Sequence, residues 1–132
     1  MKTILVDAIH AIIIADNGTW KIFEEMKDLL DKFPNRKIIL TGADRGEKFK
    51  EYGLDRAPYE VFTLEHNPEK TDPNYFRIML DRLKLNNCDV VYFEHNLAAV
   101  KSAESVGIKS YHYDERKRDL DALKKFLLKN LE

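Results

Sequence analysis

The sequence of 132 residues contains little of what several classes of protein require. Its one cysteine, Cys88, excludes an intramolecular disulfide and a cluster of thiolate metal ligands. Five glycines and four prolines are too few for a collagen-like or low-complexity chain. The 22 basic and 23 acidic side chains leave a formal net charge of −1, so the basic excess of a nucleic-acid-binding domain is missing and we expect no nucleic acid as a partner.

Long apolar runs are also missing, which argues against a membrane partner. The N-terminal run is interrupted by Asp7 and His10, and no small-residue cleavage site follows it. We therefore expect a cytoplasmic protein. The sequence shows no repeat, linker or domain boundary, and its length suits a single domain over residues 1–132. The oligomeric state is left open.

Short apolar segments alternate with amphipathic ones along the chain. Runs rich in β-branched and aromatic residues predict strands at residues 3–9, 36–41, 59–65, 88–94 and 108–113. Apolar residues at helical spacing predict helices at residues 20–33, 44–53, 71–85, 96–107 and 118–131. Right-handed crossovers between these strands predict an α/β fold with three layers, Rossmann-like, in which a mainly parallel five-stranded sheet has helices on both faces.

Local signals predict where several of these helices begin and end. Asp72 followed by Pro73 is typical of a helix start, and Asn96 is a second candidate N-cap. Gly53 and Gly107 are predicted to end the preceding helices, because glycine adopts the left-handed conformation found just after a helix.

Polar residues stand where three of the predicted strands end. These are Asp7, Thr41 with Gly42 after it, and Glu94. Ligands bind beyond the carboxyl ends of strands in such sheets, so we expect these residues to lie close together. A hydroxyl group and backbone amides suit a phosphate, and Lys70, just before a predicted helix, would face the same place. Two carboxylates would suit a hard cation.

At these positions the chain resembles the haloacid dehalogenase (HAD) superfamily of hydrolases. "ILVDAIHA" resembles the motif in which a strand ends at a nucleophilic aspartate, and "IILTG" resembles the motif of the phosphate-binding threonine. "EKTDPNYF" is similar to the motif that carries a lysine, and "VVYFEHNLAAVKSAESVGIKSYHY" to the motif in which a strand ends in an acidic pair. The likeness covers nearly the whole chain, and the short spacing implies a HAD-like domain without a large cap.

The resemblance implies a phosphohydrolase that acts through an aspartyl-phosphate. Asp7 would be the nucleophile, with Thr41 and Lys70 as the other catalytic residues. Thr41, Gly42 and Lys70 would bind the phosphate. The implied substrate is a phosphorylated small molecule or macromolecule, because capless relatives often act on exposed phosphates.

The resemblance also implies a magnesium ion as cofactor. Asp7, the backbone carbonyl of Ile9 and Glu94 would hold the ion, which would offset the negative charge around the phosphate.

The match is incomplete in the first, third and fourth motifs. Family phosphatases carry a second aspartate two residues after the nucleophile, which protonates the leaving group and then activates water. Here this position is Ile9, which has no proton to give, and general acid–base catalysis is worth about 10²–10⁴-fold in rate. Ala11 replaces a usual threonine, Thr71 replaces a proline, and the acidic pair has become Glu94-His95.

Two histidines lie beside the expected site. His10 and His95 are possible accessory residues, either as proton carriers or as ligands that would make, with Asp7 and Glu94, a set suited to a transition metal. The interpretation we favour is that both point away, His10 toward solvent and His95 capping a helix, because adjacent side chains on a strand face opposite sides.

Each proposed site residue also has a purely structural interpretation. Asp7 could cap a backbone turn, Thr41 could be an ordinary turn residue, Lys70 could be a surface lysine, and Glu94 could cap the following helix. The alternative function, which Ile9 and Ala11 favour, is a catalytically inactive, HAD-like protein that binds an anion or a protein partner in the same cleft.

Two further classes are less well supported by the sequence. Dehalogenases of the family lack the second aspartate too, but they enclose the substrate under a cap with a halide-binding arginine, for which this chain is too short. A response-regulator-like phosphoacceptor needs an acidic pair near the N-terminus, which "MKTILVDAI" lacks.

Overall fold

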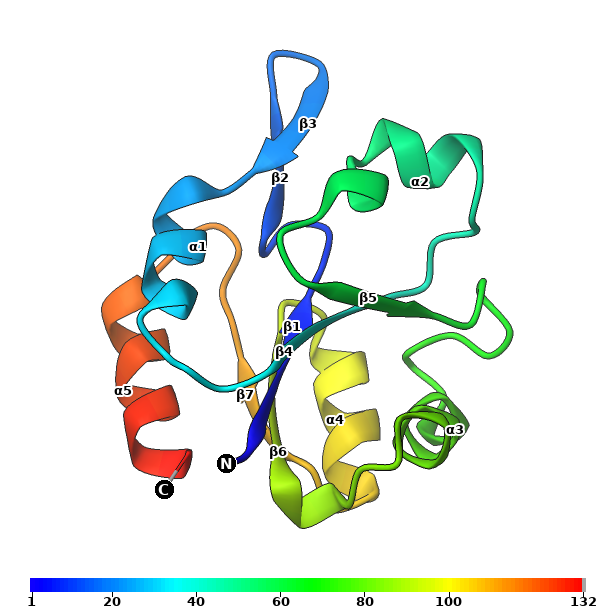
Figure 1. Cartoon of the computed structure of the whole chain (residues 1–132), viewed down its shortest axis with the longest axis vertical. Coiled ribbons are helices and arrows are strands. Elements are labelled where there is room, and N and C mark those ends of the chain that lie inside the picture. The colour runs from blue at the N-terminus through cyan, green and yellow to red at the C-terminus, as the bar shows by residue number, and fades with distance from the viewer. Residues whose placement is uncertain (132) are drawn as a thin grey trace.

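A five-stranded parallel sheet forms the centre of the protein in the computed structural model, which describes residues 1–131 (Figure 1). The strand order is β5-β4-β1-β6-β7, and every neighbouring pair is parallel. The strands are β1 (Thr3–Asp7), β4 (Lys37–Thr41), β5 (Glu60–Thr63), β6 (Val90–Glu94) and β7 (Lys109–His112). The predicted parallel α/β sheet is confirmed.

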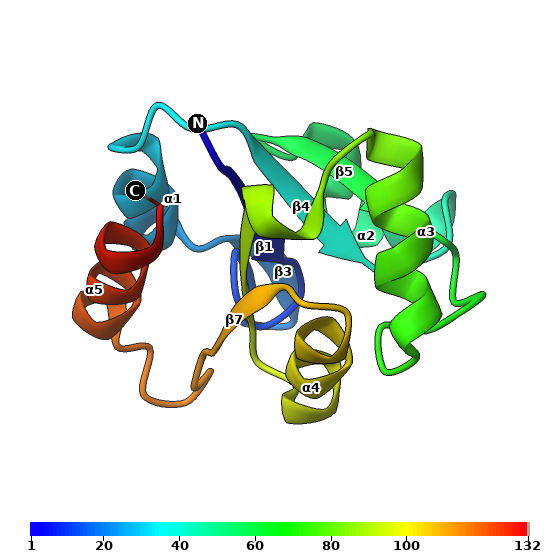
Figure 2. The same ribbon diagram turned by 90° about the horizontal axis from the view of Figure 1, so that it is seen from below.

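Helices cover both faces of this sheet, as the view from below in Figure 2 shows. One face carries α1 (Glu24–Asp31) and α5 (Leu120–Asn130), and the other carries α3 (Pro73–Leu83) and α4 (Leu97–Ser105). Alternation along the buried strands produces two cores. Ile4 and Val6 of β1 belong to the core of the first face, whereas Leu5 packs into the core of the second.

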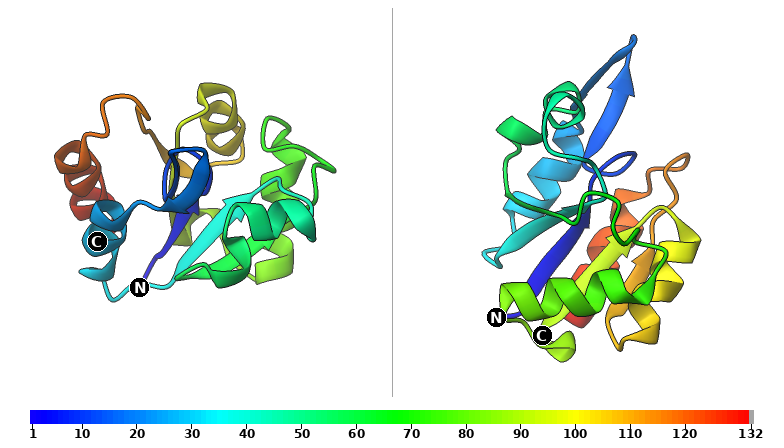
Figure 3. Two further views of the ribbon diagram at one scale, coloured as in Figure 1. Left: turned by 90° about the horizontal axis from the view of Figure 1, so that it is seen from above. Right: turned by 90° about the vertical axis from the view of Figure 1, so that its right-hand side faces the viewer.

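An antiparallel hairpin follows β1, where the sequence had predicted no strand. Its strands are β2 (Ile13–Asp16) and β3 (Thr19–Ile22), so α1 begins at Glu24 and the helix predicted from residue 20 begins too early. Asn17 and Gly18 form the turn with φ of 50° and 81°, a tight turn whose twist suits a hairpin. The hairpin extends past the carboxyl ends of the sheet strands beside α2 (Glu47–Glu51), as Figure 1 and the right view of Figure 3 show.

The predicted helix starts at Asp72 and Asn96 are confirmed. The Asp72 carboxylate accepts a hydrogen bond from the backbone N–H of Asn74 at 2.9 Å, and the Asn96 side chain accepts one from Ala98 at 3.0 Å. The helix predicted over residues 44–53 is shorter, since α2 is followed by Gly53 in the left-handed conformation and by a 3₁₀ turn at Leu54–Arg56. A second 3₁₀ turn covers Asn87–Asp89. Within residues 1–131, every helix is too short or too polar to cross a membrane.

Candidate active site

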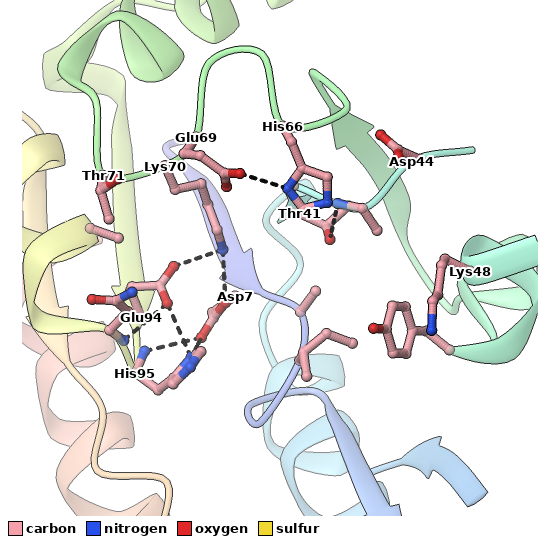
Figure 4. Close-up of a pocket in the computed structure, with 17 residues that line it drawn as sticks. Asp7, Thr41, Asp44, Lys48, His66, Glu69, Lys70, Thr71, Glu94 and His95 are labelled. Carbon is pink, nitrogen blue, oxygen red and sulfur yellow. Dashed lines mark hydrogen bonds and ion pairs between the residues drawn. The ribbon is translucent and has the colours of Figure 1, made fainter. Parts of the chain in front are cut away.

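The carboxyl ends of β1, β4 and β6 open onto a cavity of about 440 Å³. Asp7, Thr41 and Glu94 line it from these three strand ends, and Lys70 and His95 line it from the loops beside them (Figure 4). The structure therefore brings together the side chains of residues that are far apart in the sequence.

The ammonium group of Lys70 connects the two carboxylates. Its Nζ lies 2.9 Å from Asp7 Oδ1 and 2.8 Å from Glu94 Oε1, and it also donates to the carbonyl oxygen of Leu40 at 3.1 Å. Burial works against a charge on Lys70, but the carboxylates of Asp7 and Glu94 outweigh it and raise its pKa. Lys70 is thus a fixed positive charge at the cavity.

The two carboxylates are almost completely buried, with Asp7 1% and Glu94 0% exposed. Glu94 accepts hydrogen bonds from the Tyr92 hydroxyl group and, at 3.1 Å, from the backbone N–H of Asn96. Burial favours its protonation, but the charge of Lys70 and the hydrogen bonds from the side chains of His95 and Lys70 outweigh burial, so the pKa of Glu94 lies below its usual value. Burial and the nearby Glu94 carboxylate raise the pKa of Asp7.

The ring of His95 points into the site, which contradicts the interpretation that it caps a helix. Its Nδ1 lies 2.5 Å from Asp7 Oδ2 and 3.1 Å from Glu94 Oε2, while Asn96 caps α4. Strand alternation fails here because β6 ends at Glu94 and the backbone N–H of His95 then turns to donate to Asp7 Oδ2 at 3.0 Å. Burial lowers the pKa of His95, but the hydrogen bonds to Asp7 and Glu94 outweigh it and raise this pKa to about 10.

His10 lies outside the carboxylate cluster. Its Nδ1 is 3.3 Å from Glu115 Oε2, and its side chain is 45% exposed. Its ring packs edge-on against the His95 ring with the centroids 5.2 Å apart. The sequence suggested a ligand set of two histidines and two carboxylates. In the structure His95 joins Asp7 and Glu94, and His10 does not.

Thr41 and Gly42 form the part of the cavity next to β4. Thr41 is buried, its hydroxyl oxygen accepts from the backbone N–H of Ala43 at 3.2 Å, and its carbonyl oxygen accepts from the Tyr75 hydroxyl group at 2.8 Å. A Cβ atom on Gly42 would lie 3.2 Å from His66 Nδ1. Glycine at position 42 thus lets His66 approach the backbone closely.

Comparisons with solved structures identify this arrangement of strands and helices. An uncharacterised protein from Corynebacterium glutamicum superposes with a TM-score of 0.65 and 18% identity, over 96% of this chain and 94% of the other. A HAD family enzyme from Bacteroides thetaiotaomicron, an aspartate-to-alanine variant in complex with magnesium and inorganic phosphate, superposes with a TM-score of 0.64. Its identity is 12%, over 87% of this chain and 95% of that one.

The chain has the HAD fold. A dehalogenase matches as well, with a TM-score of 0.57 and 20% identity, over 73% of this chain and 46% of the dehalogenase. No protein-family model matches the sequence, and no curated protein matches it. The resemblance seen in the sequence is thus confirmed at the level of the fold. Asp7, Thr41 and Glu94 are the last residues of β1, β4 and β6.

Several residues of this HAD-fold cavity had no functional signal in the sequence. His66 and Glu69, 2.9 Å apart, line the wall beside Gly42, and Lys48 and Tyr52 line the wall near α2 (Figure 4). His66 and Glu69 are three residues apart in an irregular loop. The rule that ligands bind at the carboxyl ends of parallel strands therefore gave no reason to select them. Ile9 also lines the cavity and presents an apolar side chain.

The donor set of the site fits a divalent cation. Asp7 Oδ2 and Glu94 Oε2 converge on one point, where His95 Nδ1 stands, and ligand atoms from the three residues lie within 4.8 Å of one another. Lys70 donates hydrogen bonds to the other oxygen of each carboxylate, Asp7 Oδ1 and Glu94 Oε1. Two carboxylate oxygens facing a common point are typical ligands of Mg²⁺.

Proposed function

We propose that the protein is a slow phosphohydrolase that forms an aspartyl-phosphate on Asp7. The observation that supports this most directly is the position of Lys70 Nζ, which contacts Asp7 Oδ1 and Glu94 Oε1 at the cavity. A partly buried lysine between two carboxylates at the carboxyl edge of a HAD-fold sheet keeps the nucleophile oriented and offers positive charge to a phosphoryl group.

The proposed reaction has two steps. A carboxylate oxygen of Asp7 attacks the phosphorus atom, the bond to the ester oxygen breaks, and the leaving alcohol takes a proton from water because Ile9 cannot supply one. Water then attacks the phosphorus atom, releases phosphate and regenerates the Asp7 carboxylate. Thr41, Gly42 and Lys70 hold the phosphoryl oxygens in both steps.

The expected cofactor is Mg²⁺, held by Asp7, the backbone carbonyl of Ile9 and Glu94. The ion would supply positive charge that offsets the phosphate beside two carboxylates. The substrate is a phosphorylated small molecule or macromolecule. Within residues 1–131 the helices and strands beyond the carboxyl ends of the sheet are the short hairpin and the short α2 region (Figure 1), which fits a domain without a large cap and an exposed phosphate.

A second function, anion or partner binding without turnover, is favoured by two observations. Ile9 stands at the position of the acid–base residue, and both oxygens of Asp7 already accept hydrogen bonds, from Lys70 and from His95. A nucleophile whose lone pairs are occupied in this way reacts slowly.

Turnover of an aryl phosphate with Mg²⁺ tests the proposal. We expect slow hydrolysis by the wild type and none by Asp7→Asn prepared in parallel. Ile9→Asp, which places a carboxylate in the cavity wall, should raise the rate by about 10²-fold. Equal rates for wild type and Asp7→Asn would show a contaminating phosphatase and contradict the proposal.

Beryllium fluoride separates the two candidate functions. With Mg²⁺ it should raise the melting temperature of the wild type but not of Asp7→Asn, since it mimics a phosphoryl group on the aspartate. A rise in the melting temperature without any turnover by the wild type or by Ile9→Asp would favour the binding function.

A further inference from the structure

His95 contacts both carboxylates on the side that faces away from Lys70. Lys70 binds Asp7 Oδ1 and Glu94 Oε1, whereas His95 Nδ1 lies next to Asp7 Oδ2 and Glu94 Oε2. A cation bound between Oδ2 and Oε2 would therefore leave the contacts of Lys70 intact. It would also have the imidazole nitrogen within reach as a third ligand.

The backbone holds the His95 ring in this place. The N–H of His95 donates to Asp7 Oδ2 at 3.0 Å, and the ring of His112 lies 2.9 Å from the carbonyl oxygen of His95 through its Nε2. The His10 ring packs edge-on against the His95 ring. The side chain is 23% exposed, so part of the ring is open to solvent.

One nitrogen and two carboxylate oxygens are a different ligand set from oxygens alone. Mg²⁺ prefers oxygen ligands, whereas imidazole suits the later first-row transition metals. On binding, the cation takes the place of the proton on Nδ1. We propose that His95 Nδ1 is a metal ligand and that the site of Asp7, Glu94 and His95 selects a divalent transition-metal ion over Mg²⁺. This inference rests on the site of the proposed function and revises its cofactor, because a transition-metal ion takes the place of Mg²⁺ as the cation expected there.

The first test measures selectivity by calorimetric titration of the chelator-treated protein with Co²⁺ and with Mg²⁺. The wild type should bind Co²⁺ more tightly, and His95→Asp, which supplies oxygen ligands only, should lower the ratio of Co²⁺ to Mg²⁺ affinity by about tenfold or more. His95→Asn serves if a third carboxylate prevents folding. His10→Asn is the matched control, because His10 lies beside the ring but outside the cluster, and it should keep the wild-type ratio.

The second test detects the nitrogen ligand directly. Electron spin-echo spectra of bound Mn²⁺ should show ¹⁴N modulation in the wild type and in His10→Asn, and none in His95→Asn. A wild-type spectrum without this modulation, or an affinity ratio that His95→Asp and His95→Asn leave unchanged, would overturn the inference.

These results are independent of the proposed function. Co²⁺ selectivity with ¹⁴N modulation but without turnover would leave the inference standing and count against the phosphohydrolase. Turnover that depends on Asp7, with Mg²⁺ bound through oxygen ligands alone, would support the phosphohydrolase and overturn the inference about His95. A protein that binds neither ion would overturn the inference, and the aryl phosphate assay would still decide the function.

Discussion

Lys70 stabilises the buried carboxylates as well as contributing to the proposed chemistry. Asp7 and Glu94 are each at most 1% exposed, and Lys70 Nζ lies within 2.9 Å of both. Removing one partner from a buried group of charges is strongly destabilising, because the remaining charges cannot recover their hydration. We expect Lys70→Met to lower the free energy of unfolding by about 3 kcal/mol.

The measurement is urea denaturation in the presence of a chelator, so that no divalent cation replaces the lost charge. Lys48→Met is the control, because Lys48 lies on the same cavity but is 65% exposed and pairs with Glu51 at the surface. Surface pairs of this kind contribute about 0–1 kcal/mol. Similar losses for both variants would show that Lys70 is not a stabilising partner of the carboxylates.

Residue positions at strand ends could be predicted from the sequence, whereas His95 could not. Asp7, Thr41 and Glu94 end apolar runs, so the rule for parallel sheets placed them at one edge. His95 lies one residue beyond a strand, where alternation no longer fixes the direction of a side chain. Its orientation depends on a hydrogen bond to Asp7, 88 residues away in the chain.

The β2–β3 hairpin was not predicted, although the sequence contains its signal. Asn17-Gly18 between two apolar runs is a strong indicator of a two-residue hairpin turn. The helical spacing from Trp20 onward obscured it, because Ile22 and Phe23 fit a helix as well as a strand end. The hairpin matters for the site, since Trp20 packs against Tyr52, which lines the cavity, with ring centroids 5.2 Å apart.

The left-handed conformation of Gly18 makes this hairpin sensitive to one substitution. Gly18 has φ of +81°, and no atom lies within 4 Å of the position that a Cβ atom would occupy, so an added Cβ costs conformational strain and causes no clash. We expect Gly18→Ala to destabilise the protein by about 1 kcal/mol. Amide exchange should accelerate in β2 and β3 while it stays slow in β1.

Gly18→Asn is the matched variant for the same turn. Asparagine tolerates the left-handed region better than alanine, so it should restore most of the lost stability and protection. If alanine and asparagine behaved alike, the backbone conformation of residue 18 would not be the cause.

At the scale of the whole molecule, the chain order explains why the site forms where it does. From β1 the chain proceeds outward through β4 to β5, and then returns to place β6 on the opposite side of β1. The carboxyl ends of β1 and β6 therefore flank the point where the strand order reverses, which is where open sheets bind ligands. Asp7 and Glu94 stand at these two ends, so the fold alone determines their proximity.

The same sheet separates two hydrophobic cores, and this separation can be tested by mutation. Ile4 belongs to the core under α1 and α5, and Ile38 to the core under α3 and α4. Each isoleucine-to-valine change should cost about 1 kcal/mol, and because the two side chains face opposite sides, the double variant should lose the sum within about 0.5 kcal/mol.

Val6 and Ile39 are register partners in a single core, so Val6→Ala with Ile39→Val should depart from additivity by more. Urea denaturation of both sets measures the coupling energies, and unfolding should remain a single transition because β1 and β4 contribute to both cores. A coupling between Ile4 and Ile38 as large as that between Val6 and Ile39 would mean that strain passes through the sheet from one core to the other.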